Sequence, residues 1–228
     1  MEHIEIKLDL LREKLLEMAQ LVRAQVQNSK HALFNADDEL ASLVIAKDEI
    51  IDNFELELDK ECEQILALYN PLAIDLRFIL ACIKISLNLE RIGDHAEGVC
   101  YSFKEIKKKI NPLMMEAFKL DEMYVTALQM LDDVFLSMKN NDTKRAKKIF
   151  KKDLFLNKYY HRSIKTASIW IKEKPRETKK VLHVVNIIRK LERIGDLAKN
   201  ISEEIIFHHE GKLLNRNSLS SKKRKKKF

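Results

Sequence analysis

The sequence predicts an all-α protein that consists of two tandem three-helix bundles related by an internal repeat. The 228 residues include only four Gly and three Pro, well below the roughly 7% and 5% of an average protein. Because turns concentrate these residues, few turns and long elements are expected. Charged residues make up 34% of the chain, a composition typical of long amphipathic helices. The third indication is a motif that occurs twice.

Few residues interrupt the helical pattern, and each interruption separates two predicted helices. Pro71, Pro112 and Pro175 each start a helix, because the residue before Pro avoids the α region and Pro suits the first helical position. Residues 28–30 form a weaker break, and residues 140–143 are typical of a turn followed by an N-cap. The predicted helices are therefore 3–28, 32–69, 71–109, 113–140, 142–173 and 176–210.

The internal repeat divides the chain into two halves. Residues 89–96 match residues 191–198 at every position but one. Since one amphipathic helix cannot bury its apolar stripe alone, each half is expected to fold as a three-helix bundle. The predicted domains are residues 1–110 and 111–213, followed by a basic tail, residues 214–228, that is expected to be disordered.

The third helix of each half carries apolar residues at alternating spacings of four and three, the pattern of a bundle seam. The seam residues are Phe78, Cys82, Ile85, Leu89, Ile92, Ala96, Val99 and Phe103 in the first half, and Val184, Ile187, Leu191, Ile194, Ala198, Ile201 and Ile205 in the second. The acidic residues of the repeated motif point away from this seam. We therefore expect them on an accessible face.

Acidic residues four positions apart recur in both halves and suit a metal ion. Such residues stack on one helix face about 6 Å apart, where like charges repel unless a cation bridges them. Oxygen-rich clusters favour hard or borderline ions, so iron, manganese, zinc or magnesium are candidates. The candidate ligands are Asp48, Asp52, Glu90 and Asp94 in the first half, and Asp153, Asn157, Glu192, Asp196 and Asn200 in the second. A solvated face without metal is the alternative.

Gly93 and Gly195 lie inside the repeated motif, between its acidic residues. A Gly in the middle of a helix costs about 1 kcal/mol relative to Ala. Close approach of a neighbouring helix, or room for an ion, would explain both glycines. Arg91 and Arg193 are interpreted as ion-pair partners that restrain the neighbouring carboxylates.

No motif in the chain supports an enzyme. None of the seven His residues follows a Glu by three positions, as a ferritin-like di-iron site would require, and there is no Gly-rich phosphate loop or nucleophile elbow. His208 and His209 are expected to be a solvated pair. The three cysteines are expected to be core residues in a reducing compartment. With no apolar signal core or membrane-spanning run, a soluble protein that is not exported is expected.

The net charge of +7 comes mainly from the C-terminus, where residues 222–227 are all Lys or Arg and leave the body of the chain near +1. The body therefore gives no electrostatic reason to expect nucleic-acid binding. An anionic membrane surface would attract the tail by about 1 kcal/mol per basic residue. The two interpretations of this segment are a solubilising tail of no specific function and weak peripheral membrane contact.

The repeated motifs resemble those of the PhoU family of phosphate-signalling regulators. Residues 90–96 and 192–198 are similar to the family's Glu-x-x-x-Asp motifs, and residues 70–77 resemble the segment that opens its third helix. The resemblance covers about residues 3–210. It implies two three-helix bundles, surface metal sites at the acidic motifs, and a cytoplasmic, non-enzymatic role in phosphate uptake. It also implies damping of phosphate-starvation signalling through contacts with the ATPase subunit of a phosphate ABC transporter and a sensor histidine kinase.

The sequence departs from the family pattern in three places. Asn157 stands where Asp52 stands in the first half, so the first-half site is expected to bind metal more tightly. Gly98 stands where Asn200 stands in the second half, and the basic tail has no counterpart. The alternatives to a signalling adaptor are a metal-dependent helical enzyme and a metal-free helical scaffold. The sequence also leaves open a homo-oligomer.

Overall fold

The computed structural model describes residues 2–107 and 109–211, and almost all of them are helical. In chain order the elements are α1 (Glu2–Asn35), α2 (Asp38–Ala46), α3 (Asp48–Tyr69), α4 (Ala73–Ile106), α5 (Pro112–Ala117), α6 (Leu120–Asn140), α7 (Thr143–Glu173), the 3₁₀ turn η1 (Pro175–Glu177) and α8 (Thr178–Glu210). No strand occurs within these ranges. The predicted all-α class is confirmed.

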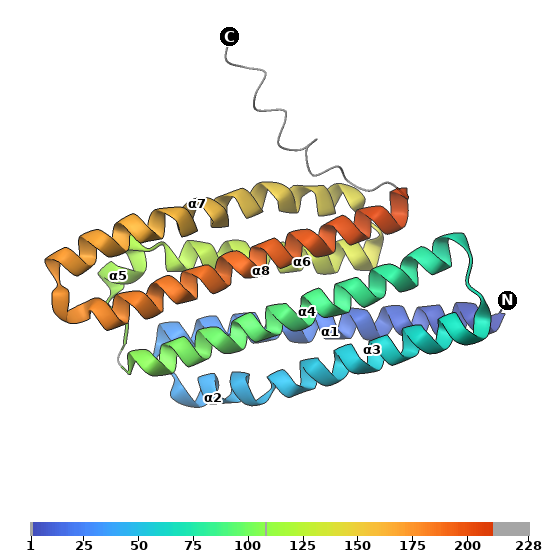
Figure 1. The fold of residues 1–228 in the computed structure, drawn as a ribbon, viewed down its shortest axis with the longest axis horizontal. Coiled ribbons are helices and arrows are strands. Elements are labelled where there is room, and N and C mark those ends of the chain that lie inside the picture. Colours follow the sequence, from blue (N-terminus) through green and yellow to red (C-terminus); the bar gives the residue numbers. More distant parts are fainter. Residues whose placement is uncertain (1, 108, 212–228) are drawn as a thin grey trace, which may run out of the picture.

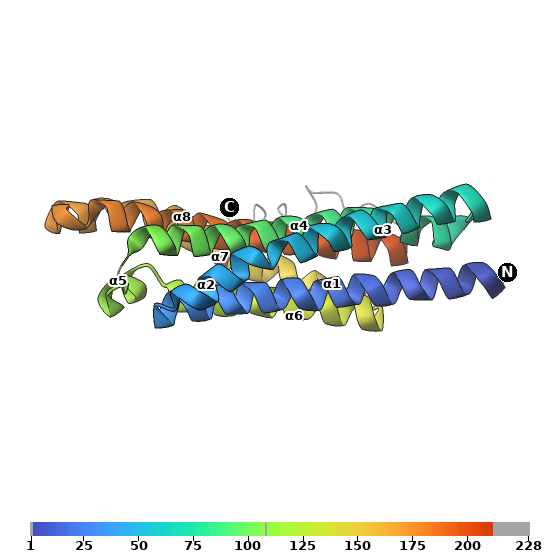
Figure 2. The same ribbon diagram turned by 90° about the horizontal axis from the view of Figure 1, so that it is seen from below.

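Each half of the chain is a three-helix bundle, and the two bundles lie side by side (Figure 1). The first is made of α1, α2 with α3, and α4, and the second of α6, α7 and α8. Figure 2 shows α1 and α6 together on one side of the molecule, with α4 and α8 on the other. The antiparallel helices α4 and α8 form the most extensive contact between two described helices.

Polar contacts extend the apolar contact between α4 and α8 across the junction of the two bundles. Lys84 pairs with Glu204 at 3.2 Å, and the Asn186 amide donates to the Ser102 hydroxyl at 2.9 Å. The two motif-bearing helices therefore meet along their lengths, which brings the two copies of the acidic motif to one region of the molecule.

The predicted bundle seams are confirmed. Ile92 and Ile194 are completely buried, and every other predicted seam residue is also buried. The three cysteines are free and lie in the core, as expected. None of the helices within the described residues is long and apolar enough to cross a membrane. The tail expected to be disordered, residues 214–228, lies outside the described residues.

The first predicted break is wrong. α1 runs through residues 28–30, because Ser29 is buried and its hydroxyl donates to the Val26 carbonyl at 2.8 Å, so it needs no contact with solvent. The chain turns instead at Ala36, which adopts a left-handed conformation with φ of 55°. Asp37 then caps α2 by accepting from the Leu40 amide at 2.9 Å.

Two helices that were predicted to be continuous are each divided in the structure. Lys47 separates α2 from α3, and Lys119, with φ of 55°, separates α5 from α6. The first break has a consequence for the acidic residues, because it makes Asp48 the first residue of α3. A carboxylate in the first turn of a helix is stabilised by the helix dipole and the free amides there.

Candidate metal centre

Three carboxylates of the first half lie together in the crevice between α3 and α4. Asp48 and Asp52 are in the first turns of α3, and Asp94 is on α4. One oxygen from each lies within 4.8 Å of the other two. Asp48 is only 7% exposed, whereas Asp52 and Asp94 are exposed to solvent. The crossing of the two helices thus converts two separate acidic pairs into one convergent donor set.

Gly93 makes room for this arrangement. A Cβ atom at this position would lie 2.8 Å from Asp48 Oδ1 and 3.1 Å from Ile51 Cδ1. Any side chain would therefore displace the Asp48 carboxylate and press on the Ile51 side chain. In the second half, a Cβ on Gly195 would clash with Leu156 Cδ1. There the glycine serves helix packing alone.

The first-half carboxylates are only partly neutralised, because the charges of Lys190 and Arg91 lower the pKa of Asp94 without forming an ion pair with it within the described residues. Asp48 Oδ1 is buried without a hydrogen bond, and among the described residues neither Asp48, Asp52 nor Asp94 forms an ion pair. Burial, with the charges of Glu97 and Asp94, raises the pKa of Asp48 to about 7. Burial and Asp52 also raise the pKa of Asp94. Since oxygen ligands with excess negative charge are what hard divalent cations prefer, the residues present fit a metal ion.

The sequence prediction omitted two acidic residues near this site, Glu97 and Glu55. It also included Glu90 among the ligands, although Glu90 does not belong to the closest group of carboxylates. Glu97 is the nearby charge that contributes most to the raised pKa of Asp48, and Glu55 contributes to the raised pKa of Glu90. Each lies three residues after a predicted ligand, a spacing that puts it on the same helix face. Glu90 itself is half-buried and lies outside the close group of three oxygens.

The second half assembles its acidic residues around an ammonium group. Lys199 Nζ lies 2.9 Å from Asp153 Oδ2 and 2.7 Å from Asp196 Oδ1. The Asn157 amide donates to the backbone carbonyl of Asp153 at 3.2 Å, along its own helix. The fifth predicted ligand of this half, Asn200, is half-buried in a groove of about 940 Å³ between α4, α7 and α8.

The expectation that the motif carboxylates lie on an accessible face is wrong for Glu192, which is 8% exposed. Asp48 and Asp153 in the preceding helices are buried as well. The physical reason is that α3 and α7 pack over the face of the motif helix that lies opposite the seam. A periodicity read from one helix cannot show a neighbour that covers its second face.

The motif arginines act differently in the two halves. Arg193 lies 3.7 Å from Asp196 and 4.0 Å from Glu192, in the ion-pair role predicted for it. Arg91 is exposed and forms no ion pair among the described residues, although its charge lowers the pKa of Glu90 and Asp94. First-half carboxylates are thus the less neutralised set.

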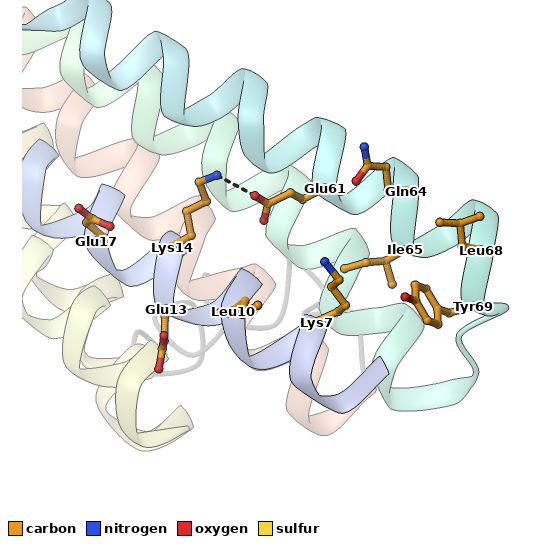
Figure 3. A pocket seen from close by; sticks show the side chains of 10 residues that line it. All are labelled: Lys7, Leu10, Glu13, Lys14, Glu17, Glu61, Gln64, Ile65, Leu68 and Tyr69. Atoms are coloured by element: carbon orange, nitrogen blue, oxygen red, sulfur yellow. Dashed lines mark hydrogen bonds and ion pairs between the residues drawn. The ribbon is translucent and has the colours of Figure 1, made fainter. Parts of the chain in front are cut away.

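Another opening of about 540 Å³ lies between α1 and α3, away from the acidic cluster. Figure 3 shows that both charged and apolar side chains line it and that Lys14 reaches across to Glu61. Lys14 pairs with both Glu57 and Glu61 at 2.7 Å. Lys14 therefore neutralises two carboxylates of this groove, as no lysine does by ion pairing for the carboxylates of the α3–α4 crevice within the described residues.

The histidine pair at the end of α8 differs from expectation. His208 is buried, with its ring centroid 5.5 Å from that of Phe78 and 4.5 Å from that of His209. Burial lowers the pKa of His208 to about 4. It is a neutral core residue and not part of a solvated pair.

Comparisons with known proteins identify one family throughout. The PhoU domain matches twice, over residues 15–102 and 120–205. The chain is 32% identical over 216 residues to the phosphate-specific transport system accessory protein PhoU homolog of Aquifex aeolicus, covering 95% of this chain and 97% of that protein. Identity to the accessory protein PhoU of Escherichia coli is 29%, over 90% of this chain and 84% of that one.

Solved structures agree with the sequence comparisons. The crystal structure of PhoU from Pseudomonas aeruginosa superposes with a TM-score of 0.87 at 31% identity, covering 91% of this chain and 99% of that one. The crystal structure of the phosphate transport system regulatory protein PhoU from Streptococcus pneumoniae gives a TM-score of 0.85 at 28% identity. It covers 93% of this chain and 99% of that one.

Proposed function

Because the chain belongs to the PhoU family of phosphate transport accessory proteins, we propose that it is a cytoplasmic, metal-binding regulator of phosphate uptake and phosphate-starvation signalling. The expected partners are the ATPase subunit of a phosphate ABC transporter and a sensor histidine kinase. Family membership supports the transport role, and the names of the relatives support association with a transport system.

The observation that carries the metal-binding part is the convergence of Asp48, Asp52 and Asp94. Their oxygens lie within 4.8 Å of one another, and the buried Asp48 Oδ1 has no hydrogen-bond partner. These three residues would hold the ion, with Glu90 and Glu97 adding negative charge nearby. A bound divalent cation would supply the positive charge that neutralises the cluster.

The fold of the chain positions the three carboxylates in this crevice. Asp48 is placed by the start of α3 and by the absence of a side chain at Gly93. Asp52 and Asp94 approach it from solvent, so an ion can enter without unfolding either helix. The ion would therefore bind across α3 and α4 and alter the surface of the first bundle, which is where we expect metal to influence partner binding.

The partner assignment is tested by isolating the tagged full-length chain from cells grown with and without phosphate, and identifying bound proteins by mass spectrometry. Recovery of a transporter ATPase subunit and a sensor kinase is the expected result. The Asp94→Asn variant, which removes one exposed carboxylate of the cluster, tests whether recovery depends on metal. Failure of the wild-type chain to recover either protein from native membranes would refute the proposed partners.

A further inference from the structure

We propose that the second acidic cluster is neutralised by the chain's own Lys199, so that this protein holds metal in its first half only. This inference rests on the proposed metal-binding function of the first half. The sequence predicted only a weaker second site because of Asn157. The proposal goes further, because it places the Lys199 ammonium where the metal would bind.

The internal repeat shows that the lysine replaces an acidic residue. Counting from the repeated motifs, Glu97 is three residues after Asp94, and Lys199 is three residues after Asp196. The exchange reverses the charge at one equivalent position of α4 and α8. The first cluster has five carboxylates, and with the ammonium of Lys190 near Asp94 and Glu97 its formal charge is −4. The carboxylates are those of Asp48, Asp52, Glu90, Asp94 and Glu97. In the second cluster, three carboxylates and an ammonium give −2, with Asp153, Asn157, Glu192, Asp196 and Lys199 at the equivalent positions.

The geometry places the ammonium where a bridging cation would lie. Lys199 Nζ contacts Asp153 on α7 at 2.9 Å and Asp196 on α8 at 2.7 Å. Both contacts have the length of charge-assisted hydrogen bonds. Asp153 is nearly completely buried, and the Lys199 side chain is about three-quarters buried. The lysine thus joins the two helices in the way that a metal ion would join α3 and α4.

The ion pair leaves no complete donor set for a metal. Within the described residues, no three acidic or histidine side chains of the second half bring donor atoms within 4.8 Å of one another, as those of the first half do. Asp153 Oδ1 is buried without a hydrogen bond, but it lies beside the Lys199 ammonium that binds the other oxygen of the same carboxylate. Asn157 is turned to its own backbone, and Glu192 lies near Arg193. A divalent ion would have to displace the lysine from a mostly buried position, which separates charges that gain from being paired.

The experiment counts Mn²⁺ bound to the full-length protein by electron paramagnetic resonance after removal of free ion. The first half is disabled by Asp94→Asn, and in that background Lys199→Glu restores the acidic residue found at the equivalent position of the first half. Lys199→Met removes the ammonium without adding a ligand. Lys148→Glu is the matched control, because Lys148 is exposed on α7, has no ion pair in the described part of the chain, and gives the same change in net charge.

The wild-type protein should bind Mn²⁺, and Asp94→Asn should lose it. Lys199→Glu should regain Mn²⁺ in the disabled background, whereas Lys148→Glu should not. In the Asp94→Asn background, Lys199→Met should lower the melting temperature relative to Asp94→Asn alone, because it removes the ammonium that neutralises Asp153 and Asp196.

Two results would overturn the inference. One is Mn²⁺ that remains in Asp94→Asn and disappears on further change of Glu192→Gln, because the native second half would then bind metal. The other is no gain of Mn²⁺ in Lys199→Glu together with an unchanged melting temperature for Lys199→Met. Absence of Mn²⁺ from the wild-type protein is a different outcome, since it refutes the metal-binding function on which the inference rests.

Discussion

Replacing Asp48 by Asn should stabilise the metal-free protein at neutral pH, although it removes a residue of the proposed functional site. Asp48 is 7% exposed, its Oδ1 has no hydrogen-bond partner, and four acidic residues surround it. The folded protein therefore holds a carboxylate that would be more stable in water. An amide at this position has nearly the same shape and no charge.

The size of the effect follows from the pKa of Asp48, which is raised from 3.8 to about 7 by burial and then by neighbouring charges, Glu97 foremost. Below about pH 4 the carboxyl is protonated in both the folded and unfolded chains, so folding carries no penalty from it. As the pH rises to about 7, the unfolded chain gains the free energy of ionisation and the folded chain does not. At about 1.4 kcal/mol per pH unit, the ionisation of Asp48 lowers the free energy of unfolding by up to about 4 kcal/mol at neutral pH.

The assay is urea unfolding followed by circular dichroism, with a chelator present, at pH 5 and pH 7.5. The free energy of unfolding of Asp48→Asn should exceed that of the wild type by up to about 4 kcal/mol at pH 7.5. At pH 5 the difference should be only about 1–2 kcal/mol. The matched control is Asp52→Asn, which removes the same charge one turn later from an exposed position and should change stability little. Added Mn²⁺ should stabilise the wild type and leave Asp48→Asn unchanged.

Equal gains for Asp48→Asn at the two pH values, or a loss at pH 7.5, would refute this reasoning. The first result would mean that the carboxylate is no harder to ionise in the folded protein than in the unfolded one. A loss would mean that Asp48 makes a stabilising interaction that the amide cannot reproduce.

The other predictions concern the core, the metal and the tail. Ile92→Asp and Ile194→Asp each bury an unpaired charge in a seam and should lower the stability measured by thermal unfolding by several kcal/mol. Glu90→Gln should lower it little. Similar losses for all three variants would show that the helix faces are misassigned. Neutralising Glu90 and Asp94 together should abolish metal retention, measured by elemental analysis, with helicity by circular dichroism unchanged; retained metal contradicts the site. The basic C-terminus should give weak, salt-sensitive binding to anionic vesicles that disappears on truncation after Asn217, and binding that survives truncation or is insensitive to salt excludes this mechanism.

The bundle cores could be predicted because helical periodicity is a local property. Ile92 and Ile194 follow from the alternating spacing of four and three, and both are completely buried. The break between α1 and α2 could not be placed in the same way. Ser29 looks like a helix-breaking surface residue in the sequence, but burial against α6 makes its hydroxyl bond to its own helix.

Candidate ligands were chosen from the repeated acidic pairs, and this reasoning located Asp48, Asp52 and Asp94 without the structure. It missed Glu97, although the i, i+3 spacing from Asp94 was available. It expected the second site to bind metal more weakly because of Asn157, but it did not include Lys199. The lysine at position 199 has no obvious meaning in the sequence, because a basic residue on a charged helix is ordinarily solvated.

The sequence by itself determined the all-α class, the internal repeat, the buried seams and the family, since helical periodicity and short motifs are visible in the order of the residues. Only the tertiary structure decided which carboxylates meet, which of them are buried, and what neutralises them. Those outcomes depend on how α3 crosses α4 and how α7 crosses α8. At the first crossing, three carboxylates converge and none of them forms an ion pair within the described residues. At the second, Lys199 supplies one from within the chain.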